Sequence, residues 1–314
     1  RSVALMMRLL LLAVLLLAPC LWSALNNRPV IGILSQPSYP PLDEFGKEFV
    51  PGSYVSWIES AGGLTTGISQ SASDEEVESI FASINGVLFT GGSMDLNNTS
   101  YYKTAKKLID LAVAANNKGD YFPIWGTCNG FELLSVAFSG GDMNVLTSFD
   151  AENISLPLQF TDYGMQSEMF QFAGPQIAST FKLPITMNNH VYGVSPESFT
   201  EYHLDEIFNV VSLSYDRQNQ PFISTMEGNG LPIFSSQWHP EKPEFEWNPN
   251  EGIDHFLVAV VGMQTMSNFF VQECRKSSHR FDSSDLQMNS LIYQYNATYT
   301  EAVDATYMQA YFIR

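Results

Sequence analysis

Short apolar runs alternate with longer amphipathic stretches between residues 29 and 138. The runs predict strands near residues 29–35, 63–68, 86–90 and 122–127. Two intervening stretches predict helices, because residues 51–60 open with a proline and Ser73 to Glu76 forms a capping box. Apolar residues from 105 to 113 recur at helical spacing and predict a third helix. Strands joined by helices through short loops indicate a parallel sheet covered on both faces.

Beyond residue 140 the pattern changes to short strands with polar turns. Residues 208–213 and 221–226 flank the polar turn 216–219 and predict an antiparallel pair. Apolar positions between 256 and 270 predict a long final helix. The sequence has no internal repeat or low-complexity linker, so we expect a single catalytic domain over residues 26–314. The predicted fold class is α/β, a three-layer sandwich with a mostly parallel central sheet plus antiparallel additions.

The N-terminal segment has the pattern of a secretory signal peptide. Arg8 precedes the apolar residues 9–18, which are followed by Pro19 and small residues. The run is too short for a transmembrane helix, so we expect residues 1–25 to be removed, leaving no stable membrane insertion. Four N-x-S/T sequons support secretion, at Asn97, Asn98, Asn153 and Asn296. The expected location is secreted, either extracellular or in a lysosome or vacuole, as a glycoprotein.

Composition limits the classes of partner. The 314 residues are 45% hydrophobic and only 15% charged, with a formal net charge of −18. The apolar content supplies a substantial core. No Lys/Arg-rich stripe is present to attract phosphates, so nucleic acid is excluded as a partner. A small-molecule substrate fits this composition, and a homodimer is compatible with it.

One cysteine stands between glycines where a strand is expected to turn into a helix. Gly126 and Gly130 flank Cys128, and residues 131–138 have an apolar helical face. The unpaired amides and the positive dipole end of a helix N-terminus favour a thiolate, so we expect the Cys128 pKa to be lowered. The alternative is a buried inert cysteine, the commoner fate of a free thiol. The glycines on either side of Cys128 favour its assignment as a nucleophile.

A histidine far downstream is the candidate proton carrier. His239 follows an apolar run and precedes Pro240, which places it at a strand end. Glu241 could accept the imidazole N–H and fix the tautomer, which would complete a Cys–His–carboxylate arrangement. The alternative for Glu241 is a solvated surface carboxylate. Cys128 and His239 lack the companion ligands of a zinc motif, so neither a metal nor another cofactor is expected.

A glycine pair after the strand at 86–90 supplies candidate oxyanion donors. An acyl-transfer enzyme needs two N–H groups where the tetrahedral oxygen forms, and the amides of Gly92 and Asn129 are the candidates. A Gly-Gly pair on its own usually marks only a turn.

Of the other two cysteines, Cys20 would leave with the signal peptide. We expect Cys274 to be a free thiol that fills space on a C-terminal helix face, and Cys128 to be free as well.

In this order and over this length, these pieces resemble the class I glutamine amidotransferase-like superfamily and, within it, the γ-glutamyl hydrolases. The resemblance runs from about Arg28 to the C-terminus. Besides the segments around Cys128, His239 and the glycine pair, it is carried by residues 28–36, 53–55, 59–62, 84–89, 119–123, 224–228 and 237–242. Thr90 stands where the family usually has a proline. The resemblance implies cleavage of γ-glutamyl isopeptide bonds in folyl and antifolyl poly-γ-glutamates. Cys128 would attack to form a thioester, with His239 carrying the proton.

The resemblance also suggests residues that contact the substrate. His190 matches a histidine of the hydrolase pattern and is expected to line the cleft, together with Gly91. Glu132 would share the helix face of Cys128 and meet the substrate's amino or amide group, or else only complement the helix dipole. The remaining histidines, His203, His255 and His279, lie in polar surroundings and are expected at the surface.

Two other functions remain open at this level. The first is a glutaminase that feeds ammonia to a synthase, against which the signal peptide argues because secretion would separate it from a cytosolic partner. The second is an inactive secreted binding glycoprotein, against which the presence of both Cys128 and His239 argues. Hydrolysis of poly-γ-glutamate compared with free glutamine separates these possibilities.

Overall fold

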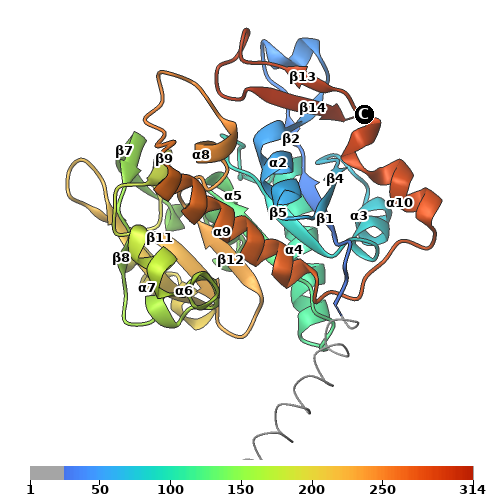
Figure 1. Ribbon diagram of the computed structural model, residues 1–314. Helices are drawn as coiled ribbons and strands as arrows, with labels where there is room; N and C mark the ends of the chain where they lie inside the picture. Colours follow the sequence, from blue (N-terminus) through green and yellow to red (C-terminus); the bar gives the residue numbers. More distant parts are fainter. Residues whose placement is uncertain (1–24, 314) are drawn as a thin grey trace, which may run out of the picture.

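An eight-stranded sheet forms the centre of the molecule in the computed structural model, which describes residues 25–313 (Figure 1). Across the sheet, the strands are β4 (Leu64–Ile68), β1 (Val30–Leu34), β5 (Gly86–Phe89), β6 (Ile124–Thr127), β12 (Ile233–Ser236), β11 (Pro221–Gly228), β10 (Phe208–Tyr215) and β8 (Gln159–Phe160). Neighbours from β4 to β12 pair in parallel, and those from β12 to β8 pair antiparallel. The predicted mostly parallel sheet with antiparallel additions is confirmed.

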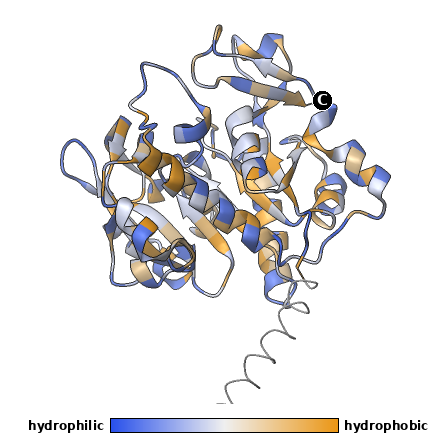
Figure 2. Cartoon of the chain, in the orientation of Figure 1, coloured by the Kyte–Doolittle hydropathy of each residue, from blue (hydrophilic) through white to orange (hydrophobic). Residues whose placement is uncertain are grey.

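Helices cover both faces of this sheet. On one face lie α3 (Asp74–Phe81), α4 (Ser100–Asn116), α5 (Asn129–Phe138) and α7 (Pro196–Glu201), and on the other α2 (Gly52–Ser60), α6 (Glu168–Thr180) and α9 (Leu257–Cys274). Strand side chains alternate between the two cores: Val30 and Leu34 of β1 enter the first, and Ile31 and Ile33 enter the second. Figure 2 shows hydrophobic residues concentrated in the inner strands. The three-layer prediction is therefore correct.

Two smaller sheets flank the central one. The first orders β13 (Ala297–Tyr299), β14 (Gln309–Ile313), β3 (Glu48–Pro51) and β2 (Gln36–Pro37), and the second pairs β7 (Thr147–Leu156) with β9 (Thr186–Gly193). Short helices complete the fold: α8 (Lys242–Phe245), α10 (Ser284–Ser290) and 3-10 turns at Leu42–Glu44, Met143–Val145, Gly164–Gln166, Leu204–Glu206 and Ile292–Gln294. The first small sheet lies near the C-terminus in Figure 1. In it, the C-terminal strand β14 pairs with β3 from the N-terminal part of the chain.

Local sequence signals placed several elements correctly. Ser73 Oγ accepts from the Glu76 amide at 3.3 Å and Glu76 Oε2 accepts from the Ser73 amide at 2.8 Å, which is the predicted capping box. The helix predicted over residues 51–60 is α2. It begins at Gly52 rather than at Pro51, since Pro51 is the last residue of β3. Cys128 and Cys274 are both buried free thiols, as predicted. A Cβ added to Gly86 would lie 2.7 Å from the Cys274 sulfur, so this sulfur does fill space in the core.

The predicted signal peptide, residues 1–25, lies almost entirely outside the described residues. Between residues 25 and 313, no helix combines the length and apolar character needed to cross a bilayer.

Candidate active site

Cys128 occupies a sharp turn between β6 and α5, at the carboxyl ends of the central parallel strands. Its backbone has φ 51° and ψ −106°, a left-handed conformation that is strained for a residue other than glycine. The turn fits only because its neighbours are glycines: a Cβ on Gly130 would stand 2.2 Å from the Phe89 carbonyl oxygen, and one on Gly126 would stand 2.6 Å from the Gly130 oxygen. The Cys128 amide donates to the Ser236 carbonyl at 2.8 Å, which ties the turn to β12. The predicted strand–helix elbow is present.

His239 and Glu241 form a buried pair just after β12. The Nδ1 of His239 lies 2.7 Å from Oε1 of Glu241, so the ring N–H donates to the carboxylate and leaves Nε2 as the basic nitrogen. The His239 amide donates to the Met187 carbonyl of β9 at 2.8 Å, which fixes the backbone of the loop. Glu241 is 1% exposed, so the alternative of a solvated surface carboxylate is wrong.

Gly91 fills the space between the cysteine and the histidine. A Cβ on Gly91 would meet His239 Cε1 at 2.6 Å, the Tyr54 hydroxyl at 2.7 Å and Cys128 Cβ at 3.2 Å. The Cys128 Cβ and the imidazole of His239 therefore lie on either side of a position where only hydrogen fits. The topology explains this proximity, since β6 carries Cys128, its parallel neighbour β12 delivers His239, and β5 on the other side leads into Gly91.

Gly92 and Asn129, which carry the two candidate oxyanion amides, line the same pocket as Cys128. Gly92 has φ 150°, and its N–H donates no hydrogen bond within the described range 25–313, whereas the Asn129 N–H bonds the Cys128 thiol. The Asn129 amide also favours the thiolate form of Cys128. The Gly92 amide is thus available to an incoming oxygen, and the Asn129 amide is directed at the thiol, where the tetrahedral intermediate would form.

The expected lowering of the Cys128 pKa is wrong for this environment. Burial raises the pKa of the thiol well above its ordinary value, and the carboxylates of Glu132 and Glu241 raise it further. The Asn129 amide and the Lys242 ammonium act in the opposite direction but are weaker. The sequence could not reveal that the helix N-terminus is closed off from water by the elements around it.

A pocket of about 360 Å³ opens beside Cys128. Its lining includes Cys128, Gly92, Asn129, Glu132, Asn189 and His190. A larger pocket of about 720 Å³ lies over the first small sheet and contains none of the candidate catalytic side chains. The smaller pocket is the candidate substrate site, because it alone of these two holds the nucleophile.

Two titratable side chains in this pocket have strongly shifted pKa values. Burial raises the pKa of Glu132 to about 7, against the opposing effect of hydrogen bonds from Asn129 and Gln237. Their side-chain amides lie 3.2 Å and 3.3 Å from the carboxylate oxygens. Burial lowers the pKa of His190 to about 3, so its ring is neutral, with Nδ1 2.7 Å from the Tyr192 carbonyl oxygen. Glu132 lines the pocket and also lies in the first turn of α5, where a carboxylate complements the helix dipole. Its position therefore fits both of the roles considered for it.

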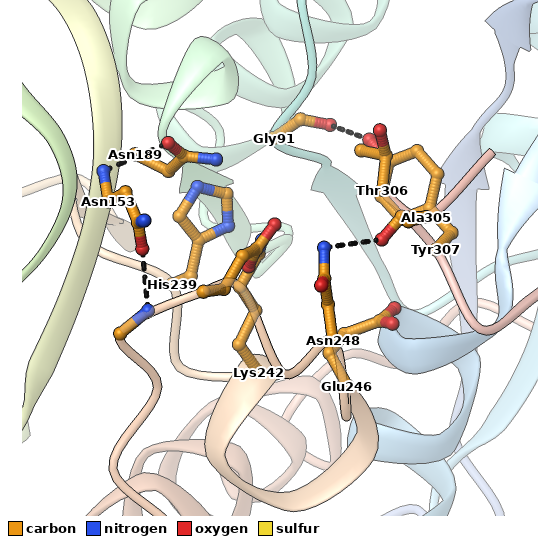
Figure 3. Close-up of polar contacts among 12 residues, drawn as sticks. Gly91, Asn153, Asn189, His239, Lys242, Glu246, Asn248, Ala305, Thr306 and Tyr307 are labelled. Atoms are coloured by element: carbon orange, nitrogen blue, oxygen red, sulfur yellow. Dashed lines mark hydrogen bonds and ion pairs between the residues drawn. The ribbon is translucent and has the colours of Figure 1, made fainter. Parts of the chain in front are cut away.

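The four sequon asparagines Asn97, Asn98, Asn153 and Asn296 are all exposed. The side chain of Asn153 is already engaged: its Nδ2 donates to the Asn250 carbonyl at 2.9 Å and its Oδ1 accepts from the Gly252 amide at 2.5 Å. Figure 3 shows Asn153 on the same side of His239 as Asn189. Among the remaining histidines, only His203 is exposed. The surface prediction is wrong for His279, which packs under α3 and bonds the Phe81 carbonyl at 2.8 Å.

Several buried polar residues around the site were not singled out by the sequence analysis. Tyr54 of α2 lies 3.4 Å from His239 Nδ1, and Gln36, Gln237, Lys242 and Tyr307 are also nearly inaccessible. Buried polar residues just beyond a parallel strand are a usable signal, and Gln36, the second residue after β1, would have been identified by it. No local pattern marks Tyr307, because its role depends on the packing of the C-terminal segment.

Comparison with known proteins gives matches over most of the chain. The peptidase C26 family model matches residues 29–241. Gamma-glutamyl hydrolase B of Dictyostelium discoideum is 40% identical over 282 residues, which covers 88% of this chain and 81% of that protein. The gamma-glutamyl hydrolase of Homo sapiens is 39% identical, covering 91% and 89%. Gamma-glutamyl hydrolase 1 of Arabidopsis thaliana is 32% identical, covering 91% and 83%.

Among solved structures, the glutaminase domain of Trypanosoma brucei CTPS, determined with bound acivicin, matches with a TM-score of 0.53 and 13% identity. The match covers 79% of this chain and 95% of that chain. At this identity it shows the fold alone, and it agrees with the predicted class I glutamine amidotransferase-like architecture.

Proposed function

This chain belongs to the peptidase C26 family and is a relative of the γ-glutamyl hydrolases, and from that premise we propose that it is a cysteine peptidase that hydrolyses γ-glutamyl bonds. The observation that carries the proposal is the position of Cys128 at a strained elbow, with Cys128 and His239 both against Gly91. The carboxylate of Glu241 holds the other side of the imidazole. This arrangement suits acyl transfer through a covalent intermediate.

In the proposed mechanism, Cys128 attacks the γ-carbonyl carbon of the substrate. Because burial raises the thiol pKa, the proton leaves as the carbon–sulfur bond forms, and Nε2 of His239 receives it. Glu241 stabilises the imidazolium that results. The amides of Gly92 and Asn129 donate to the oxyanion of the tetrahedral intermediate.

The second half of the reaction releases both products. His239 returns its proton to the leaving α-amine, the carbon–nitrogen bond breaks, and a thioester to Cys128 remains. A water molecule then gives a proton to His239 and attacks the thioester carbonyl. Collapse of this second intermediate frees the γ-carboxylate and restores the thiol.

We propose folyl and antifolyl poly-γ-glutamates as the substrate class. The pocket beside Cys128 admits an extended side chain, and Glu132 and His190 line it at the position where the group next to the scissile bond would lie. Glu132 is suited to meet the substrate's amino or amide group. Passage through the secretory route, with delivery outside the cell or to a lysosome or vacuole, follows from the predicted signal peptide and the exposed sequons.

The test uses the purified full chain and three substrates: pteroyl-γ-pentaglutamate, the α-linked pentaglutamate and free glutamine. Product masses followed over time at acidic and neutral pH should show cleavage of the γ-linked chain and none of the α-linked one. Hydroxylamine should trap the thioester as a hydroxamate, and Cys128→Ala should abolish both signals. Faster hydrolysis of glutamine would instead support a glutaminase. Ligand binding by both proteins without any cleavage would support a binding glycoprotein.

A further inference from the structure

The peptide unit between Gly91 and Gly92 is held from one side by buried side chains of distant segments. Gln36 Nε2 donates to the Gly91 carbonyl at 2.7 Å, and the Tyr307 hydroxyl donates to the same oxygen at 3.4 Å. Figure 3 shows the Gly91 carbonyl directed at Tyr307, with His239 on the other side of Gly91. The preceding amide, that of Gly91, donates to the Tyr54 hydroxyl at 2.7 Å. The chain is thus fixed on both sides of the Gly91 Cα.

A trans peptide is planar, and its C=O and N–H point in opposite directions. Fixing the Gly91 carbonyl toward Gln36 therefore turns the Gly92 N–H away from the small sheet and toward the reaction centre. We propose that Gln36 and Tyr307 are positioning residues that aim the Gly92 amide into the oxyanion hole. The inference rests on the proposed function, in which that amide stabilises the tetrahedral intermediate.

The freedom of the glycine pair makes such a restraint necessary. Gly92 has φ 150°, and a residue without a Cβ can rotate its peptide plane at little steric cost. Gln36 restrains that rotation by packing closely against the loop. Its Oε1 lies 2.7 Å from the position that a Cβ on Gly92 would take, and its Nε2 donates to Thr90 Oγ1 at 2.9 Å. The side chain lies along three successive residues of the loop and holds them in one conformation.

Both positioning residues are associated with the first small sheet rather than with the central one. Gln36 is in β2, and Tyr307 lies two residues before β14. These strands are joined through β3, so the C-terminal segment supports the oxyanion loop although it lies beyond residues 29–241, which the family model matches. The first small sheet therefore has a part in the reaction.

The experiment compares acyl transfer with a thiol reaction that needs no oxyanion hole. Alkylation of Cys128 by iodoacetamide is a displacement at saturated carbon, so it reports thiol reactivity and folding but not oxyanion stabilisation. Loss of one oxyanion donor lowers kcat by about 10²–10³-fold, and misaiming it should lower kcat by about 10–10²-fold. We expect this loss for Gln36→Leu, with KM and the alkylation rate within about twofold of wild type.

Two further variants keep the test decisive if Gln36→Leu folds poorly. Gln36→Glu preserves the shape: an ionised carboxylate repels the Gly91 carbonyl, whereas a protonated one donates to it. Its kcat relative to wild type should therefore rise as the pH falls, and the ratio removes the pH dependence that the two proteins share. Tyr307→Phe removes the 3.4 Å bond to the Gly91 carbonyl and the 3.4 Å bond that the hydroxyl accepts from Gln36 Nε2, but it leaves the shorter bond from Gln36 to Gly91 and should cause a smaller loss. The control is Gln294→Leu, which removes a 3.0 Å bond from the same side-chain atom to a carbonyl at an exposed position.

Full kcat in folded Gln36→Leu, or equal losses in hydrolysis and alkylation, would overturn the inference. Failure of the proposed function looks different, because then wild type itself would not cleave γ-glutamyl chains. In that case acylation of Cys128 by p-nitrophenyl acetate, measured as a burst absent from Cys128→Ala, uses the same oxyanion hole. The expected order of burst rates is again wild type, then Tyr307→Phe, then Gln36→Leu, and equal rates would refute the role of Gln36.

Discussion

Replacement of Glu132 by glutamine should change how the stability of this protein depends on pH. Burial raises the pKa of Glu132 from its ordinary value of 4.5 to about 7. Below pH 4.5 the carboxyl is protonated in both the folded and unfolded states, so it carries no penalty. Between pH 4.5 and 7 the folded state retains a proton that the unfolded state has lost, and the free energy of unfolding falls as the pH rises.

The size of this effect follows from the shift. At about 1.4 kcal/mol per pKa unit, the rise from 4.5 to about 7 corresponds to about 3 kcal/mol of lost stability above neutral pH. A glutamine side chain has no such charge to bury, so Glu132→Gln should gain about 3 kcal/mol over wild type between acid and neutral pH. The site can accept an amide, because Asn129 Oδ1 and Gln237 Oε1 have no hydrogen-bond partner among the described residues and rotation of either side chain would offer an acceptor.

The assay is urea unfolding of wild type and Glu132→Gln at several pH values from 4.5 to 8. Any constant effect of the amide cancels when the two proteins are compared across pH, as do contributions from other buried carboxyls such as Glu227. Glu152→Gln is the matched control, since Glu152 lines the same pocket but is exposed and should change the stability by less than about 0.5 kcal/mol at any pH. A difference between wild type and Glu132→Gln that stays flat from acid to neutral pH would refute the reasoning.

Other substitutions probe the elbow, the histidine and the loops. Gly130→Ala would place a methyl group 2.2 Å from the carbonyl at the end of β5, so we expect at least about 2 kcal/mol of destabilisation in urea unfolding and loss of hydrolysis; wild-type stability would contradict the close packing. Glu241→Gln keeps the shape but removes the charge that stabilises protonated His239, and steady-state assays should show kcat reduced by about 10²-fold with little change in KM. Because both its side-chain nitrogen and its side-chain oxygen are hydrogen-bonded, Asn153 should be unmodified in protein expressed through a secretory route, and a glycan there in mass spectra would contradict this. Asn153→Gln should speed hydrogen exchange in residues 250–252.

Much of the active site could be predicted because its determinants are local. The glycines around Cys128 report a turn that tolerates no Cβ, and the structure shows the contacts that forbid one. The alternation of strands and helices gave the parallel sheet, and the carboxyl edge of such a sheet is where ligands bind. His239 was placed at a strand end by the proline that follows it.

Properties that depend on the surroundings of a residue were predicted less well. The dipole of α5 suggested a lowered thiol pKa, but desolvation outweighs it once the sheet and its neighbours close over Cys128. His279 lies in a polar stretch of sequence, yet its ring is packed against Phe81 and Phe122 with centroids 5.3 Å away from each. Exposure is set by what packs on a residue, and residues distant in sequence supply that packing.

The sequence by itself determined the four parallel strands between residues 29 and 127 and the helices between them, the elbow at Cys128 and the identity of the candidate proton carrier. Each of these depends on spacing, glycine or proline within a few residues, and such preferences act whatever the rest of the chain does. Tertiary structure alone decided that Glu241 is buried against the imidazole, that the thiol is shielded from water, and that Gln36 and Tyr307 converge on the Gly91 carbonyl. Those contacts join segments up to 271 residues apart, as Gln36 and Tyr307 are, and only the packed sheets bring such atoms within bonding distance.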